Sequence, residues 1–599
     1  MNHLNRTNRT NQPSLSGGPN SAKQDDLSSP PTLFAAGDLT GAEISPGPVV
    51  SPLQVFVTGG VVSSLGKGIT AASLGRLLTA RGLRVVMQKL DPYLNVDPGT
   101  MNPLEHGEVY VTNDGAEVDL DLGHYERFVG GELTGASSVT AGSVYQAVLA
   151  RERRGGYLGR TVQVIPHITN EICARVLALH QTNVDVVITE IGGTVGDIES
   201  LPFLEAARQL RSMLESVVFI HVTLVPVLTN GEQKSKPTQH SVMELRSRGI
   251  TPDILVARCS EPLGAGVRAK MAELCGVQPD DVIEALDARI LYEVPLSMAA
   301  QGLDTRVLTR GGRSTWLTLA PDLTGWEAMV ARVSAPMHYL RVGVVGKYAG
   351  PDAYLSVMEA LGHAGSVDSV SVTVELVDAE SLAGAVPNGS EGSDAPGGHG
   401  GPDLDLILGS YDALVVPGGF GERGFEGKIA ALCWARTHSV PTLGICLGLQ
   451  AMVVETARSL CHLPDAHSSE LDPDTVNPVV DLLADQRGVV ELGGTMRLGA
   501  WPAELAPGSR VAEAYGELLV SERHRHRYEV NPAYRGVLGA AGLIVSGTSP
   551  DGRLVEYVER TDHPYYLACQ AHPEFLSRPE SGHPLFLGLL RAARARQVE

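Results

Sequence analysis

A glycine-rich loop between a short apolar run and a helical pattern constrains the fold of this chain more than any other feature. The chain runs through four successive segments here: the apolar run Leu53–Thr58, the loop Gly59–Ile69, the helical pattern Ala71–Leu78 and the strand-like run Arg84–Lys89. Strand, glycine loop, helix and strand in this order form a βαβ unit, which predicts a parallel sheet and the α/β class. Two further apolar runs are expected to add buried strands: Val184–Thr189 and Ser216–Thr223.

A second α/β start follows at Leu340–Gly346, after a stretch of mixed character from about Leu303 to Met337. Strands are expected to recur later, at Ala413–Val416, Pro441–Ile445 and Tyr566–Gln570. The chain is therefore divided into a disordered extension at 1–52, a first α/β domain at 53–315, a linker at 316–339 and a second α/β domain at 340–599. The segment 387–402 is rich in Gly, Ser, Asp and Pro and is expected to be a flexible surface insertion.

Composition and charge exclude several classes of function. The 599 residues carry a net charge of −21, so the chain gains nothing from the counterion release that drives nucleic-acid binding, and no DNA or RNA partner is expected. The seven cysteines include no C-x-x-C pair, which argues against zinc and thioredoxin-type sites. Their odd number and wide scatter argue against a disulfide framework and favour a reducing cytoplasm. The absence of an apolar run of about 18 residues predicts no transmembrane helix, and we expect no membrane partner.

The loop Gly59–Ile69 has the arrangement that binds phosphate groups. Backbone N–H groups at a helix N-terminus attract phosphate, and Lys67 is placed to reach the terminal phosphates of a nucleotide. The match to the usual P-loop is imperfect, because five residues separate Gly60 and Gly66, and Gly68 replaces the Ser or Thr that normally binds magnesium. A tight glycine turn with an exposed lysine is the simpler alternative.

Acidic residues elsewhere can replace the missing magnesium ligand. Asp119 and Asp121 lie two residues apart, so on a strand they would face the same side. Glu190 follows the predicted strand Val184–Thr189, at the sheet edge where α/β proteins bind ligands. Each acid taken alone is more often a surface charge or a helix cap. The segment Lys234–Gln239 adds two positive charges in a segment interrupted by proline, which suits phosphate binding but is also typical of a solvated loop.

The second domain contains a pattern typical of a cysteine nucleophile. Gly444–Gly448 has the form G-x-C-x-G, with Cys446 at a turn from strand to helix. Downstream, His572 is placed to act as a base, and Glu574 is placed to orient it. Upstream, the glycines of Pro417–Gly421 can aim backbone N–H groups at an oxyanion. A lone cysteine or histidine is usually structural, but this ordered set predicts amide cleavage through a thioester, with release of ammonia.

Long motifs in both domains resemble the CTP synthase family, over about residues 53–592. The matching segments are Phe56–Gly68, Lys89–Thr100, Asp119–Phe128, Gln163–Thr169, Glu190–Glu199 and Arg523–Val530. The resemblance implies an N-terminal synthetase domain with a P-loop-like, dethiobiotin-synthetase-type parallel sheet at 53–315. It also implies a class I glutaminase (glutamine amidotransferase) domain at 340–599.

The resemblance implies a reaction that the residues alone do not name. ATP would phosphorylate O4 of the UTP uracil, and ammonia from L-glutamine, delivered through an internal channel, would displace the phosphate to give CTP. Mg²⁺ would be the metal, GTP an allosteric activator and CTP a feedback inhibitor. The chain would form a homodimer or homotetramer in the cytoplasm and serve pyrimidine nucleotide biosynthesis.

The resemblance also implies roles for individual residues. Ser64, Leu65, Gly66, Lys67, Gly68 and Ile69 would hold ATP together with Asp121, and Asp121 and Glu190 would bind magnesium. Lys67 and Lys89 would stabilise phosphoryl transfer. The residues contacting UTP, or CTP as inhibitor, would be Ser63, Asp197, Ile198, Glu199, Lys234, Ser235, Lys236, Pro237, Thr238, Gln239 and Lys270. Glutamine would be held by Gly419, Leu447, Gly448, Leu449, Gln450, Glu470 and Arg527, next to a Cys446–His572–Glu574 triad and an oxyanion hole formed by the backbone of Gly418 and Leu447.

Two other functions compete with this interpretation. The first is a different glutamine-dependent, ATP-using amidotransferase, such as one acting on a corrinoid acid, for which UTP would be inert. The second is a non-catalytic scaffold, which has no physical need for the complete set of candidate catalytic residues. One departure from the family concerns the adenine contact, where Leu286-Asp287-Ala288 stands in place of a Lys-Asp-Val type of sequence.

Overall fold

The computed structural model describes residues 51–598, apart from 182, 349, 385–401 and 483–495. The predicted extension up to residue 50 and the predicted insertion up to residue 401 therefore lie outside the described residues. Among the described residues, no helix is long and apolar enough to cross a membrane.

Seven parallel strands form the first sheet, in the order β5–β2–β6–β1–β7–β8–β9. Their bounds are β1 Leu53–Gly59, β2 Val85–Asp91, β5 Ser138–Thr140, β6 Val186–Ile191, β7 Val217–Leu224, β8 Ile254–Cys259 and β9 Val282–Leu286. Both faces of this sheet are buried, because Val55 and Val57 point into one helical layer while Phe56 points into the other. The parallel sheet predicted from the βαβ unit is thus confirmed.

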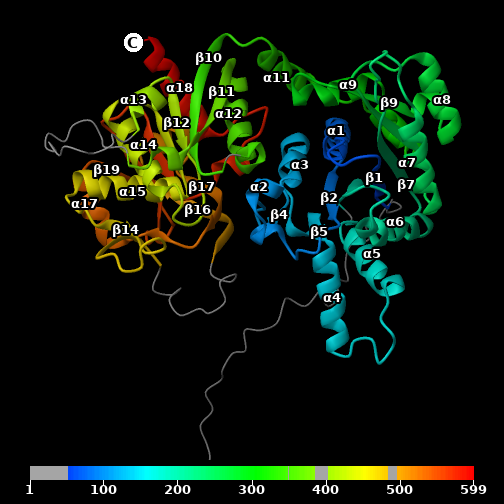
Figure 1. Cartoon of the computed structure of the whole chain (residues 1–599), viewed down its shortest axis with the longest axis horizontal. Coiled ribbons are helices and arrows are strands. Elements are labelled where there is room, and N and C mark those ends of the chain that lie inside the picture. Colours follow the sequence, from blue (N-terminus) through cyan, green and yellow to red (C-terminus); the bar gives the residue numbers. More distant parts are fainter. Residues whose placement is uncertain (1–50, 182, 349, 385–401, 483–495, 599) are drawn as a thin grey trace, which may run out of the picture. The chain divides into compact units, whose positions relative to one another are not determined.

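Helices cover both faces of the first sheet (Figure 1). One layer contains α1 Lys67–Ala80, α3 Asp121–Val129, α9 Val294–Ala300, α10 Leu303–Arg310 and α11 Thr324–Ser334. The other contains α4 Ala141–Arg153, α5 Thr169–Leu177, α6 Leu201–Met213, α7 Lys236–Ser247 and α8 Ala265–Cys275. The stretch predicted as a linker contains α11, which buries Trp326, Met329 and Val330 in the first core.

Nine strands form the second sheet, in the order β11–β10–β12–β13–β21–β20–β19–β16–β17. Their bounds are β10 His338–Gly346, β11 Val370–Asp378, β12 Ala413–Val416, β13 Thr442–Ile445, β16 Arg497–Leu505, β17 Leu519–His526, β19 Leu543–Thr548, β20 Val555–Arg560 and β21 Tyr566–Cys569. The five strands from β11 to β21 are parallel, and the remaining pairings are antiparallel.

Helices also cover both faces of the second sheet (Figure 1). One layer contains α13 Leu404–Leu408, α14 Phe425–Thr437, α15 Leu447–Leu460 and α17 Arg535–Ala540. The other contains α12 Leu355–Val367, α16 Arg510–Tyr515 and α18 Pro584–Val598. The smaller elements are α2 Pro103–His106, β3 Tyr110–Val111, β4 Glu117–Val118, β14 Ala466–Ser468, β15 Asn477–Asp481 and β18 Glu529–Val530.

Candidate active sites

Cys446 lies at a sharp turn between β13 and α15, as the G-x-C-x-G pattern predicts. Its backbone has φ 54° and ψ −104°, a left-handed conformation that is strained for a residue with a side chain. The turn is held from one side, because the N–H of Cys446 donates to the carbonyl of Cys569 at 2.8 Å. The thiol is thereby presented at the N-terminus of a helix, above the carboxyl end of the sheet.

Two glycines allow the helix to start this close to the sheet. A side chain at Gly448 would overlap the carbonyl oxygen of Val416 on the neighbouring strand β12. A Cβ at Gly444 would lie 2.8 Å from the Cβ of Ala568 on β21. The glycines of the motif are therefore required by backbone packing around the cysteine, and not only by the turn itself.

His572 and Glu574 follow β21 and face Cys446. The side chains of His572 and Glu574 share a hydrogen bond of 2.7 Å between Nδ1 and Oε1, and Nε2 of His572 is buried with no hydrogen-bond partner among the described residues. Burial lowers the pKa of His572, but the negative charges of Glu574 and Cys446 outweigh it and raise the pKa to about 10. The sulfur of Cys446 lies 3.8 Å from Nε2 of Gln570. The three residues predicted as a triad thus converge.

The glycine loop after β12 approaches the same place. A Cβ built on Gly418 would lie 2.8 Å from Cε1 of His572 and 3.6 Å from the Cβ of Cys446, so the backbone at Gly418 faces both residues. Leu447 is the first residue of α15, and its N–H belongs to the first turn, which has no partner inside the helix. The backbone of two separate segments, at Gly418 and at Leu447, therefore lies beside Cys446.

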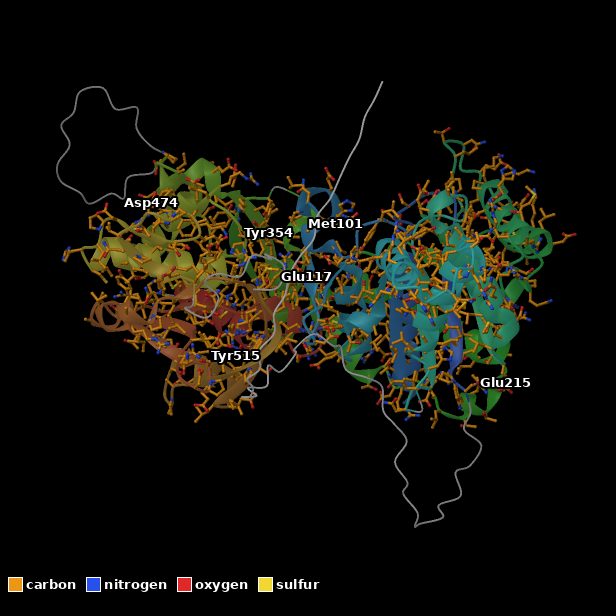
Figure 2. All side chains as sticks on the ribbon, turned by 90° about the horizontal axis from the view of Figure 1, so that it is seen from below. Met101, Glu117, Glu215, Tyr354, Asp474 and Tyr515 are labelled. Carbon is orange, nitrogen blue, oxygen red and sulfur yellow. The ribbon has the colours of Figure 1, made fainter. Side chains whose placement is uncertain are left out.

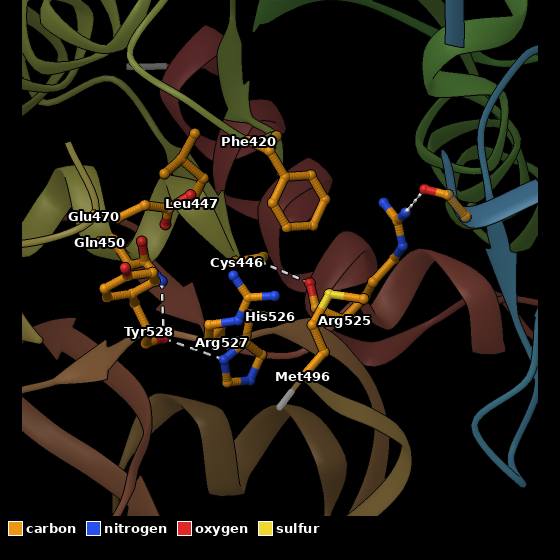
Figure 3. Close-up of a pocket in the computed structure, with 12 residues that line it drawn as sticks. Phe420, Cys446, Leu447, Gln450, Glu470, Met496, Arg525, His526, Arg527 and Tyr528 are labelled. Carbon is orange, nitrogen blue, oxygen red and sulfur yellow. Dashed lines mark hydrogen bonds between the residues drawn. The ribbon is translucent and has the colours of Figure 1, made fainter. Parts of the chain in front are cut away.

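A pocket opens over Cys446 (Figure 3). Five residues predicted to contact glutamine line it: Gly419, Leu447, Gln450, Glu470 and Arg527. Two others do not line it, because Gly448 packs against Val416 and Leu449 is fully buried in the second core. Sequence reasoning missed several lining residues: Gly99, Phe420, Met496, Arg525, His526 and Tyr528. Four of the lining residues belong to the motif Arg523–Val530. The motif therefore indicated this part of the pocket, although only its Arg527 was predicted to contact glutamine.

Residues of opposite charge, Glu470 and Arg527, line this pocket. The pKa of Glu470 is raised by burial, while a hydrogen bond from the Gly421 N–H and the positive charge of Arg527 counteract that rise. Gln450 donates through Nε2 to the carbonyl of Tyr528 at 3.1 Å, and its Oε1 is buried without a partner among the described residues. A carboxylate, a guanidinium and an unsatisfied amide oxygen match a ligand with an amino acid head group.

In the other half of the chain, the predicted phosphate loop connects β1 to α1. Gly66 precedes the helix with φ 91°, a conformation that favours glycine. Lys67 is 8% exposed, and its ammonium donates to the carbonyl of Gly193 at 2.8 Å. Burial lowers the pKa of Lys67, although Glu190 and Asp121 act to raise it. The exposed-lysine alternative is thus wrong for Lys67.

Lys89, Asp121 and Glu190 form a cluster beside this loop, in which Lys89 and Glu190 are buried and Asp121 is partly exposed. The ammonium of Lys89, at the end of β2, donates to Asp121 and lies 3.2 Å from Oε1 of Glu190, at the end of β6. These carboxylates raise the pKa of Lys89 well above its usual value, against the effect of burial. The expectation that Asp119 and Asp121 share a strand is wrong, because Asp121 is the first residue of α3 and its N–H donates to Asp119.

The cluster fits a magnesium ion that also binds phosphate oxygens. A Cβ at Gly68 would lie 3.2 Å from Oδ1 of Asp121 and 3.3 Å from Oε2 of Glu190, so the carboxylates face the position where a P-loop carries its hydroxyl. Magnesium is commonly bound by one or two carboxylates together with phosphates and water. No group of three or more His, Cys, Asp or Glu side chains within the described residues could hold a metal alone.

A pocket beside the loop is lined by Ser64, Leu65, Gly66, Ile69, Leu286 and Ala288, together with residues that the sequence did not single out. Those residues include Arg258, Leu291 and Met298. Arg258 donates to the carbonyl of Leu286 at 2.8 Å and pairs with Asp287 at 2.5 Å. The segment 286–288, whose sequence departs from that of the family, therefore borders the pocket with its backbone. The side chain of Asp287 pairs with Arg258.

The residues predicted to contact UTP are only partly brought together. Asp197 influences the pKa of Lys67 and accepts two hydrogen bonds from Thr194, at 2.6 and 2.9 Å. Lys234 pairs with Glu232, whose pKa is also lowered by the charge of Lys270. Lys236 to Gln239 begin α7 with Pro237 in its first turn, so the proline starts a helix where a break was expected. Within the described residues, no hydrogen bond or ion pair joins Ser63, Ile198 or Glu199 to the predicted lysine contacts.

Comparisons with known proteins agree with these features. The family model for the CTP synthase N-terminus matches residues 54–311, and that for class I glutamine amidotransferases matches residues 351–592. A CTP synthase of Carboxydothermus hydrogenoformans is 56% identical over 545 residues, covering 90% of this chain and 98% of the relative. A CTP synthase of Acidothermus cellulolyticus is 55% identical over 550 residues, covering 90% and 95%.

A solved structure, the glutaminase domain of Trypanosoma brucei CTPS with bound acivicin, is 36% identical with a TM-score of 0.38, covering 43% of this chain and 94% of that one. On the strength of the two family models and the near full-length relatives, the chain belongs to the CTP synthase family.

Proposed function

We propose that this chain converts UTP to CTP, using ATP and ammonia that it releases from L-glutamine. The observation that carries the proposal is that one polypeptide contains both the Cys446–His572–Glu574 constellation and the charged cluster of Lys67, Lys89, Asp121 and Glu190. A scaffold would have no reason to bury so many charged groups around two pockets, since buried charges are costly unless they serve a purpose or are well paired.

In the glutaminase half, Sγ of Cys446 would attack the side-chain amide carbon of glutamine. The oxygen of the tetrahedral intermediate would accept hydrogen bonds from the N–H groups of Gly418 and Leu447. His572 is cationic at neutral pH because its pKa is about 10, so it is suited to protonate the departing ammonia. It would then remove a proton from the water that hydrolyses the thioester, and glutamate would leave. Glu470 and Arg527 would hold the amino acid head group.

In the synthetase half, the loop Ser64–Ile69 would hold the phosphates of ATP while Lys67 and Lys89 face the transferred phosphoryl group. Magnesium, when bound between Asp121 and Glu190, would neutralise charge on the phosphate oxygens. UTP would bind near Ser63, Asp197–Glu199, Lys234–Gln239 and Lys270. Its O4 would accept the phosphoryl group, and ammonia would then replace that group at C4 to give CTP, ADP and phosphate.

Ammonia has to travel between the two reactions in its unprotonated form. A pocket lined by Cys446 and His572 is also lined by Pro103, Glu108 and Val109, which belong to the segment that precedes α3. This continuity supports an internal channel. We also propose, from the family alone, that GTP activates the enzyme, that CTP inhibits it, and that the chain forms a homodimer or homotetramer in the cytoplasm.

The decisive experiment supplies the purified protein with UTP, ATP, Mg²⁺ and glutamine, with and without GTP, and follows CTP by absorbance. Cys446→Ala is the matched control, because it should abolish CTP formation from glutamine and leave CTP formation from free ammonia. If the wild-type protein hydrolysed glutamine but left UTP unchanged, the chain would be an amidotransferase for another acceptor. If Cys446→Ala also lost the ammonia-dependent reaction, the assignment of the two chemistries to separate sites would be wrong.

A further inference from the structure

A fully buried lysine lies directly behind the glycine loop of the glutaminase site. Lys428 is on α14, has 0% exposure, and donates through Nζ to the carbonyl oxygen of Pro417 at 2.5 Å. Within the described residues, no Asp or Glu forms an ion pair with Lys428. A lysine ammonium is rarely buried without a partner, because desolvation of the charge is expensive. The requirements of folding therefore do not explain why a lysine occupies position 428.

The bonded carbonyl belongs to the peptide that also contains the N–H of Gly418. A trans peptide is planar, so its carbonyl oxygen and its N–H point in opposite directions. With the carbonyl of Pro417 turned toward α14, the N–H of Gly418 is turned the other way, and the backbone at Gly418 faces Cys446 and His572. Among the described residues, this N–H donates to no other group.

We propose that Lys428 is a positioning residue that fixes the orientation of the Pro417–Gly418 peptide and so keeps the oxyanion hole formed. This inference rests on the proposed glutaminase activity and adds a residue to it. A rotation of the peptide by half a turn would point the carbonyl of Pro417 at the thiol and remove a donor. The hydrogen bond from Lys428 opposes that rotation, and polarisation of the carbonyl strengthens the N–H as a donor.

The electrostatic surroundings of Lys428 are consistent with this role. Its pKa is lowered to about 7 by burial and by the charge of Lys347, while Cys446 is the group that acts to raise it. An ammonium and a neutral amine both carry N–H groups, so the bond to Pro417 persists in either form. Lys347 is also buried and donates to the carbonyls of Phe420 and Gly421, farther along the same loop.

The test replaces Lys428 with Met, which has a similar length, is neutral and favours helices. We expect kcat for glutamine hydrolysis, measured as glutamate release, to fall about 10- to 100-fold, somewhat less than the loss of a whole oxyanion donor. KM for glutamine should change by less than about twofold, since the hole acts on the transition state. Lys428→Leu is made in parallel, so that a neutral variant remains available if one fails to fold.

Two readouts separate positioning from a general structural defect. Alkylation of Cys446 by iodoacetamide forms no oxyanion, so its rate should stay within about twofold of the wild type. CTP formation from free ammonia should also be retained, and Ile429→Met on the same helix is the control for a disturbed core. An unchanged kcat, a raised KM alone, or alkylation that slows in parallel with hydrolysis would each overturn the proposal. If the wild-type protein released glutamate normally but formed no CTP, only the proposed acceptor, UTP, would be contradicted.

Discussion

His572 is held as a cation by its neighbours, since Glu574 and Cys446 together raise its pKa to about 10 despite its burial. The 2.7 Å hydrogen bond to Glu574 also fixes which ring nitrogen faces the thiol. Glu574 therefore acts on the reaction only through His572. Its removal should therefore affect the glutamine reaction and spare the ammonia reaction.

We predict that Glu574→Gln lowers kcat for glutamine hydrolysis by about 10²- to 10⁴-fold, because an amide stabilises the wrong tautomer and no longer favours the imidazolium. Steady-state glutamate release measures this effect, and ammonia-dependent CTP formation serves as the control. A loss of less than about threefold would mean that Glu574 does not orient His572.

The raised pKa of His572 also predicts a pH dependence of stability. A group whose pKa rises on folding stabilises the native state fully below its ordinary pKa, here 6.5, and loses that contribution as pH rises through about 10. The Tm of the wild type should therefore exceed that of His572→Gln most near pH 6, and the difference should shrink toward pH 10. Thermal melts at one scan rate test this, and a difference that grows with pH would contradict it.

At the scale of elements, the start of α15 is fixed by contact with the neighbouring strand. We predict that Gly448→Ala displaces this helix start, because the added methyl group overlaps the carbonyl of Val416. The cost to stability should be about 1–3 kcal/mol, and kcat for glutamine hydrolysis should fall about 100-fold as the nucleophile shifts.

The matched control is Gly362→Ala on α12, where nothing lies within 4 Å of the added Cβ. That change should be neutral or stabilise the protein by up to about 1 kcal/mol. Equal effects of the two substitutions on the melting temperature and on glutamate release would show that the contact with Val416 is unimportant.

The strands that position both sites were predictable because they are short apolar runs. β12 begins and ends as predicted, and β13 and β1 differ by one residue. Strand β17 was not predictable, since Leu519–His526 contains Arg, His and Glu at buried positions. Its charges are compensated by residues far away in sequence, and no local pattern reveals such pairs.

The contrast between local patterns and partners far away in sequence also explains which site residues could be predicted. Cys446 and Lys67 stand in motifs whose local geometry determines their chemistry. Arg525 lines the pocket over Cys446 while pairing at 2.7 Å with Glu117, which is 408 residues away and is labelled in Figure 2. Lys428 was not predicted either, because its partner among the residues that the structure describes is a backbone carbonyl. The helix start at Asp121 did have a local signal, because Asp119 precedes it and its side chain accepts a hydrogen bond from the N–H of Asp121.

At the scale of the whole molecule, α3 connects the cluster of Lys89, Asp121 and Glu190 with residues of the glutaminase site. Asp121 begins the helix and bonds Lys89, while Glu126, on the same helix, pairs at 3.0 Å with Arg523 of β17. The carbonyl of Arg523 in turn accepts a 2.7 Å hydrogen bond from the N–H of His572. Tyr110 provides a second link to the glutaminase site. Its hydroxyl donates to the carbonyl of Phe575, and the ring of Phe575 stacks on that of His572.

We predict that Asp121→Ala stops CTP formation from both glutamine and ammonia, because magnesium and phosphoryl transfer are required whichever source supplies the nitrogen. Basal glutamate release without nucleotides should continue at close to the wild-type rate. CTP absorbance and glutamate release, measured on one preparation, test both statements. Sustained CTP formation from ammonia would remove Asp121 from the metal site.

The Glu126–Arg523 pair allows the most demanding prediction, since both side chains are fully buried, at 0% exposure. Glu126→Gln leaves a buried guanidinium without its charge partner, and we expect a loss of about 3–5 kcal/mol of stability. Combining it with Arg523→Met should recover part of that loss, because the two buried charges are then removed together. Asp368→Asn, which breaks the more exposed pair with Arg591, is the control and should cost at most about 1 kcal/mol.

Activity measurements should show whether the Glu126–Arg523 pair does more than stabilise the protein. Because Arg523 holds the backbone of His572, Glu126→Gln should lower glutamine hydrolysis more than ammonia-dependent CTP formation, measured below the melting temperature of the variant. Equal losses in both reactions would indicate that the pair only stabilises the protein. A selective loss would show that α3, which starts at the proposed metal ligand, also sets the geometry of the base that releases ammonia.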